Sequence, residues 1–106
     1  MPKYLFHGSY STEGIKGLLK DGGTKRRAVA QRAIESAGGK LESFYYAFGK
    51  SDVIALVDAP DNVSVAAVSL AIAASGAFAG KTTVLLTAEE IDAATKKAVK
   101  YTPPGA

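Results

Sequence analysis

The sequence predicts an α+β fold of the ferredoxin-like, split β-α-β type, in which helices cover one face of a four-stranded antiparallel sheet. Short aromatic and aliphatic runs alternate along the chain with segments whose apolar residues recur at helical spacing. The predicted elements follow the order β-α-β-β-α-β, with one further helix at the C-terminal end. Because 106 residues is a common domain size and no repeat or linker interrupts the chain, we expect one domain over residues 1–100 and a loose tail at 101–106.

The first half of the chain predicts a strand followed by an interrupted helix. Lys3 to Tyr10 is aromatic and aliphatic without helical spacing, which favours a strand, and Ser11-Thr12 has the residue types that begin a helix. The helical stretch that follows is split or kinked at Gly22-Gly23. Thr24 is then expected to cap the second part, and Gly38-Gly39 to end it in a left-handed conformation.

The middle of the chain predicts a hairpin and a second helix. Leu41–Phe48 and Asp52–Asp58 read as two strands joined by a short connection that contains a glycine. Asp61 or Asn62 is expected to cap a helix that runs to about Ser75. This helix is apolar nearly all round, so other parts of the protein should cover it.

The stretch SGAFAGKTT resembles a phosphate-binding loop but lacks its geometry. Only three residues separate Gly76 from Gly80, and a strand rather than a helix is predicted after Lys81. We therefore interpret Gly76 as the helix end and Gly80 as a turn residue, with a fourth strand over Thr82–Thr87. Thr87-Ala-Glu-Glu90 is a capping box that opens a last helix, which we expect to pass through Ile91 and Ala94 as far as Val99.

Composition and charge exclude several classes of protein. No apolar run is long enough for a membrane helix, no signal peptide is evident and cysteine is absent, so we expect a cytoplasmic protein without disulfides. The net charge is +3, and six basic residues between positions 13 and 32 stand against only Glu13 and Asp21. No nucleic-acid module accompanies this basic segment, so we expect no specific nucleic-acid binding and no membrane partner.

The predicted strands are apolar on both faces. The first strand offers Tyr4 and Phe6 to one side and Leu5 and His7 to the other, and the third strand alternates in the same way. On the second strand we expect Phe44, Tyr46 and Phe48 on one face and Leu41, Tyr45 and Ala47 on the other. Because helices cover only one face of such a sheet, we expect a symmetric homodimer in which two sheets pack face to face.

Several segments in this order resemble the GYD domain family, a branch of the dimeric α/β-barrel superfamily. They are Tyr4-Leu-Phe, Ser11-Thr-Glu-Gly14, Gly38-Gly39-Lys40-Leu41, Phe48-Gly-Lys-Ser-Asp52, Val53-Ile-Ala-Leu, Ala59-Pro-Asp61, and Gly76 followed by Lys81-Thr-Thr83. At the family's Gly-x-Tyr-Asp motif this chain has Gly49-Lys50-Ser51-Asp52, with serine in place of tyrosine. The resemblance implies a ferredoxin-like protomer, a dimeric α/β barrel or a higher assembly, and a cavity rather than a particular reaction.

We therefore expect a small hydrophobic or aromatic molecule to bind in a pocket of a homodimer, with catalysis left open and no cofactor assigned. The candidate polar contacts are His7, Tyr46 and Asp52. His7 is the only histidine, and one strand does not supply the further ligands that a metal site needs. An interfacial role for His7 and a hydrogen-bonding role for Asp52 in the turn are the structural alternatives.

Three further hypotheses stay open. Lys25, Arg26 and Arg27 lie at a helix start and form a candidate anion site, although such runs are often a solvated face. The chain is alternatively a non-catalytic assembly or regulatory module, in which contacts between protomers use all the apolar positions. It is otherwise an N-terminal-proline tautomerase, in which removal of Met1 exposes Pro2 as a base and the basic helix holds an acidic substrate.

Overall fold

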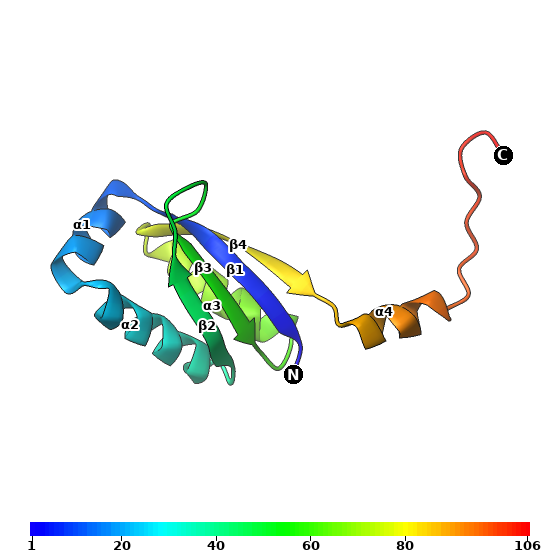
Figure 1. The fold of residues 1–106 in the computed structure, drawn as a ribbon, viewed down its shortest axis with the longest axis horizontal. Coiled ribbons are helices and arrows are strands. Elements are labelled where there is room, and N and C mark those ends of the chain that lie inside the picture. The colour runs from blue at the N-terminus through cyan, green and yellow to red at the C-terminus, as the bar shows by residue number, and fades with distance from the viewer.

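The computed structural model describes residues 1–106 and confirms an α+β fold consistent with the ferredoxin-like prediction (Figure 1). The elements are β1 (Lys3–Tyr10), α1 (Thr12–Asp21), α2 (Gly23–Ser36), β2 (Lys40–Tyr46), β3 (Val53–Asp58), α3 (Asn62–Ala74), β4 (Phe78–Leu85) and α4 (Ala88–Thr95). The four strands form one sheet in the order β2-β3-β1-β4, and all neighbouring strands are antiparallel. None of the helices is long and apolar enough to cross a membrane.

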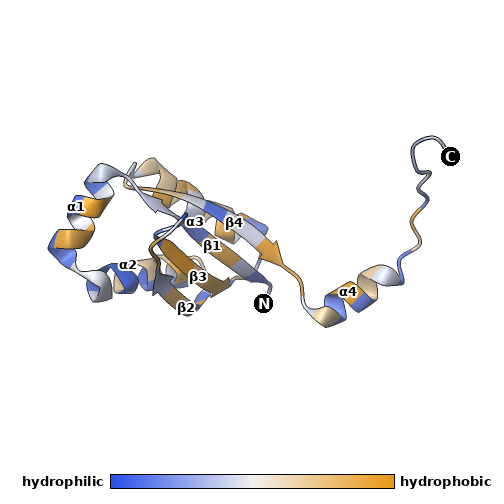
Figure 2. Cartoon of the chain, turned by 45° about the horizontal axis from the view of Figure 1, so that its top comes forward, coloured by the Kyte–Doolittle hydropathy of each residue, from blue (hydrophilic) through white to orange (hydrophobic).

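The alternation of β1 and β3 places a small core beneath α2 and α3. Tyr4 on β1 and Val53, Ala55 and Val57 on β3 are buried on the side of the sheet that these helices cover. Leu5 and His7 point to the opposite, open face, as the alternation predicts. Figure 2 shows β3 apolar over most of its length, so both of its faces carry apolar side chains.

A β-bulge corrects the predicted faces of β2. The register with β3 shifts between Leu41 and Ser43, so Leu41 pairs with Val57 and Phe44 with Ala55. Leu41 therefore packs against the same core as Val57, although strict alternation would place the Leu41 and Phe44 side chains on different faces of the sheet. A bulge adds one residue to a strand and reverses the faces of the residues on one side of it.

The fourth strand begins earlier than predicted, and Gly80 is not a turn residue. β4 starts at Phe78, and Gly80 lies within it opposite Gly8. A Cβ on Gly80 would lie 2.7 Å from the Phe6 ring, which stacks on Phe78 with centroids 5.7 Å apart. This glycine makes room for an aromatic ring on the neighbouring strand, a role that local sequence does not distinguish from a turn. Gly76 ends α3 with a φ of 71°, as predicted.

Most of the helix caps are as predicted. The Ser11 hydroxyl accepts a hydrogen bond from the Gly14 amide, the Asp61 carboxylate accepts one from Ser64, and Thr87 and Glu90 form the capping box of α4. The backbone hydrogen bond from Ser64 lowers the pKa of Asp61. Thr24 is not a cap, because α2 begins at Gly23, and the last helix ends at Thr95 rather than Val99.

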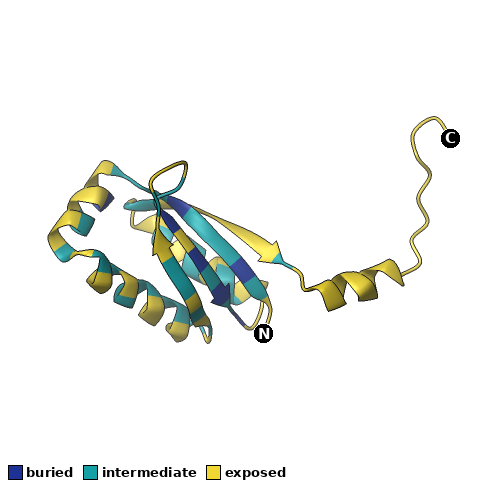
Figure 3. Cartoon of the chain, viewed as in Figure 1, coloured by how far each residue is buried: buried dark blue, intermediate teal, exposed yellow.

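The C-terminal part of the chain extends away from the body of the protein. Figures 1 and 3 show α4 and the segment after it beyond the end of β4, with exposed residues throughout. The radius of gyration is 17.0 Å, whereas a compact domain of this length has about 13 Å. The single chain therefore leaves this segment without tertiary packing.

The close packing of β1 against β4 at Gly8 can be tested by substitution. A Cβ at Gly8 would lie 2.2 Å from the Ala79 carbonyl oxygen, so Gly8→Ala should reduce the free energy of unfolding by roughly 1–3 kcal/mol. Gly17→Ala is the matched control, because Gly17 lies within α1 with open space around it and the change should stabilise the helix by about 0.5–1 kcal/mol. Urea unfolding followed by circular dichroism measures both changes, and equal stabilities would contradict the close packing.

Candidate functional site

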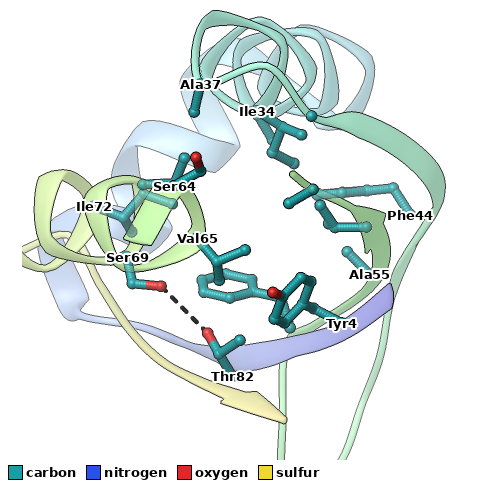
Figure 4. A pocket seen from close by; sticks show the side chains of 16 residues that line it. Tyr4, Ile34, Ala37, Phe44, Ala55, Ser64, Val65, Ser69, Ile72 and Thr82 are labelled. Atoms are coloured by element: carbon teal, nitrogen blue, oxygen red, sulfur yellow. Dashed lines mark hydrogen bonds between the residues drawn. The ribbon is translucent and has the colours of Figure 1, made fainter. Parts of the chain in front are cut away.

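A hollow lies between the sheet and the helices that cover it (Figure 4). Its inner part is a cavity of about 60 Å³, lined almost entirely by apolar side chains from β1, β2, β3, α2 and α3. Tyr4, Phe6 and Phe44 line it from the strands, and Ile34 and Ile72 from the helices. The hydrogen bond between the Ser69 and Thr82 hydroxyls, at 3.2 Å, closes the side of the cavity next to β4.

The hollow continues as a more open groove of about 520 Å³ between α2 and α3. Ala37, Val68 and Ile72 line both the cavity and the groove, so the two share a wall. Small side chains dominate the groove, because α2 contributes Ala33 and α3 contributes Ala67 and Ala71. The short alanine side chains thus leave the space between the two helices unfilled.

Polar side chains gather at one end of the groove, where β1 ends. Tyr10 and Arg26 line it there, and Tyr46 lies beside Tyr10 and donates its hydroxyl to the Gly23 carbonyl at 2.8 Å. Burial raises the pKa of the Tyr10 phenol, and Tyr46 adds to the rise while Arg26 opposes it. Tyr10 is therefore a neutral hydrogen-bond donor at physiological pH, next to a guanidinium group.

Only part of the candidate anion site lies at this groove. The Arg26 and Lys25 side chains both approach the Asp21 carboxylate at 3.6 Å, so two cations share one anion. Arg26 also lines the groove, whereas Arg27 is exposed and has no ion-pair partner. The positive charge at the polar end of the groove is therefore that of the Arg26 guanidinium group.

His7 and Tyr46 lie on opposite faces of the sheet and cannot contact one ligand. His7 is on the open face, where its Nδ1 lies 3.0 Å from the Ser51 hydroxyl and its strand neighbours are Ile54 and Lys81. No group of three or more histidine, cysteine, aspartate or glutamate side chains lies together to hold a metal ion. His7 therefore belongs to the surface that the sheet leaves uncovered.

Asp52 joins the end of the β2-β3 connection to β1. Its carboxylate accepts a hydrogen bond from the Tyr10 amide at 3.0 Å, and its own amide donates to the Gly8 carbonyl at 2.8 Å. Its carbonyl accepts from Ala47 at 2.9 Å. These bonds match the alternative role for Asp52, which is hydrogen bonding within the turn. Contact between Asp52 and a ligand stays a prediction.

Pro2 lies away from the basic helix start that was expected to assist it. The Pro2 carbonyl accepts a hydrogen bond from Ala59 at 3.0 Å, and the next residue, Lys3, forms ion pairs with Glu42 and Asp58. Arg26 lies near Tyr10, at the other end of β1. The structure therefore does not bring Pro2 together with the Lys25–Arg27 segment.

Tyr10 and the shared wall of the hollow are not among the residues that the sequence singles out. Tyr10 lies on the same face of β1 as Tyr4 and Phe6, so strand alternation contained a signal for it. Val68 and Ile72 are four residues apart on α3, but a helix that is apolar nearly all round does not indicate which face lines a cavity.

The role of Asp52 can be tested by two substitutions. Asp52→Ala should reduce the free energy of unfolding by about 1–3 kcal/mol, because the Tyr10 amide loses its acceptor. Asp52→Asn keeps an oxygen acceptor and should have a smaller effect in the same urea titration. A change in ligand affinity at unchanged stability would instead assign Asp52 to the binding site.

Comparison with known proteins gives one match. A family model described as the GYD domain matches residues 4–95, which span β1 to the end of α4. Searches of curated proteins and of solved structures found no match.

Proposed function

The chain belongs to the GYD domain family, and we propose that it binds a small hydrophobic or aromatic molecule in the hollow between its helices and its sheet. The observation that carries this proposal is an interior that the protein's own side chains leave unfilled. Only seven of the 106 residues are buried, although apolar side chains line the hollow on both sides.

The dimensions of the hollow favour a ligand that lies mainly in the groove. The inner cavity of about 60 Å³ has room for about two water molecules, or for a methyl group or the edge of a ring. The groove of about 520 Å³ falls within the range of small-molecule sites, which are mostly apolar with few polar groups. The ligand body therefore occupies the groove, and its apolar tip reaches toward the cavity.

The polar end of the groove favours a ligand with an acidic or hydrogen-bonding group at one end. Arg26 supplies a guanidinium group, and Tyr10 supplies a neutral phenol next to Tyr46. A carboxylate or sulfonate placed there gains a charge-assisted hydrogen bond while the rest of the ligand stays among apolar side chains. Of the candidate residues named from the sequence, the proposed site thus includes Arg26 and Tyr46.

The fluorescent probe 1-anilinonaphthalene-8-sulfonate tests the proposal, because it joins aromatic rings to an anionic group. Ala71→Leu should fill the groove and weaken binding by about tenfold, and Arg26→Gln should weaken it by a similar factor. Ala74→Leu is the matched control: it adds the same side chain to an exposed position of α3 that does not line the groove. If all three variants bound the probe as tightly as the wild-type protein does, binding in the groove would be contradicted.

We also propose that a second copy covers the open face of the sheet. Leu5, Tyr45, Ile54 and Leu56 lie on that face, and no helix of the chain covers them. Sheets pack face to face about 10 Å apart when both present apolar side chains. His7 then lies within the contact between the two sheets.

If the protein is only an assembly module, this contact persists and the groove variants leave probe binding unchanged.

Native mass spectrometry of untagged protein tests this homodimer. Ile54→Lys places a charge on the open face, where Ile54 is 40% exposed in the single chain, and should shift the protein toward monomer. Leu19→Lys is the control, because Leu19 is 81% exposed on α1, away from the open face. A wild-type protein that is entirely monomeric would overturn the packing of two sheets. The same spectrum reports whether Met1 is retained and whether a small molecule accompanies the chain.

A further inference from the structure

α4 is a helix without a tertiary partner. We call Leu86–Thr95 the arm; every residue of it is exposed, and Figure 3 shows it beyond the body of the protein. α4 has eight residues and a complete capping box. Isolated helices shorter than about 12–15 residues are marginal in water, so the cap alone does not stabilise it. The exposed side chains of Leu86 and Ile91 supply apolar surface for a partner.

The connection to β4 directs the arm away from its own chain. Only Leu86 and Thr87 separate β4 from α4, and neither is a glycine, proline, asparagine or aspartate, the residues that most favour reversal of the chain. Thr87 is extended, with φ −73° and ψ 163°. The arm therefore continues outward from the end of β4, where no part of its own chain covers it.

The outward side of α3 is an apolar surface that fits such a helix. Five of its residues form what we call the α3 stripe, and all are exposed: Val63, Ala66, Leu70, Ala73 and Ala74. No charged residue occurs from Asn62 to Gly80. A helix that is apolar all round is normally buried, and the small side chains of this stripe allow another helix to approach closely.

Charge complements the apolar surfaces. The arm carries Glu89, Glu90 and Asp92 and no basic residue, and the basic residues Lys96, Lys97 and Lys100 follow it in the chain. Beside α3 lies α2, with four basic residues against the single acidic residue Glu35; the basic residues are Lys25, Arg26, Arg27 and Arg32. Lys25 and Arg32 are seven positions apart and exposed, so they lie on one side of α2, two turns apart. An acidic helix placed on the α3 stripe thus meets a basic neighbour.

We propose that the arm of one chain packs on the α3 stripe of a second copy, with its acidic residues facing α2 of that copy. The contact lies on the helical side of the protein, opposite the open face of the sheet, so it is separate from the proposed contact between sheets. It also does not depend on a ligand in the groove. Two copies that exchange arms cover both α3 stripes by symmetry.

Cysteine cross-linking tests this contact, because the natural chain has no cysteine. Leu70→Cys protein is mixed with Ile91→Cys protein and treated with a short bismaleimide reagent. The mixture should yield cross-linked heterodimer well above a control mixture of Leu19→Cys with Ile91→Cys, since Leu19 is more exposed than Leu70 but lies on α1. Equal yields in the two mixtures would overturn the proposal. So would an intramolecular link in dilute protein that carries Leu70→Cys and Ile91→Cys together, because the arm would then pack on its own chain.

A charge exchange in the same assay tests the orientation. Glu89→Lys with Asp92→Lys on the arm should lower the cross-linked yield by about tenfold, because attractive contacts with α2 become repulsive. Glu90 is left unchanged because it completes the capping box. Lys25→Glu with Arg32→Glu on the Leu70→Cys chain makes α2 of that chain acidic. These changes should restore the cross-linked yield with the arm that carries Glu89→Lys and Asp92→Lys. They should lower the yield with the arm of natural sequence. Loss of cross-linking without this reciprocal rescue would contradict packing of the arm beside α2.

Discussion

The alternation of side chains along β1 is the constraint on which the rest of the structure depends. This strand hydrogen-bonds to both β3 and β4, so each of its residues faces either the helices or the open side. Tyr4 is the most buried large side chain, and its hydroxyl donates to Asn62 at the start of α3 at 2.7 Å. One strand thereby sets both the core and the position of the helix that forms one side of the groove.

The core that results is thin, and this explains the hollow. Tyr4, Val57 and Ala59 form the buried cluster, with Ile34, Leu41 and Val65 packed around it. Above this cluster the helices present mostly alanine and serine, which cannot fill the space between two helices and a sheet at normal packing density. These short side chains therefore leave the hollow open in the single chain.

Apolar surface is left uncovered in three places: the open face of the sheet, the α3 stripe and the arm. Each lies on a different part of the chain, and burial of apolar area is the main favourable term in association as in folding. The extended shape, 58 Å along its longest axis, comes from the arm and the residues after it, which project beyond the end of β4. The ligand and assembly proposals therefore arise from one property, a protomer that does not complete its own core.

The sequence by itself determined the order of the elements, the faces of β1 and β3, and the caps at Ser11, Asp61 and Thr87. These features depend on residues within a few positions of one another, so local patterns contain the information. Tertiary structure alone decided the bulge in β2, the place of Gly80 inside β4, and the separation of His7 from Tyr46. It also decided that Tyr10 and Arg26 meet at the groove. Such features depend on register and packing between elements distant in the chain, where a shift of one residue reverses a face, and no local pattern specifies that register.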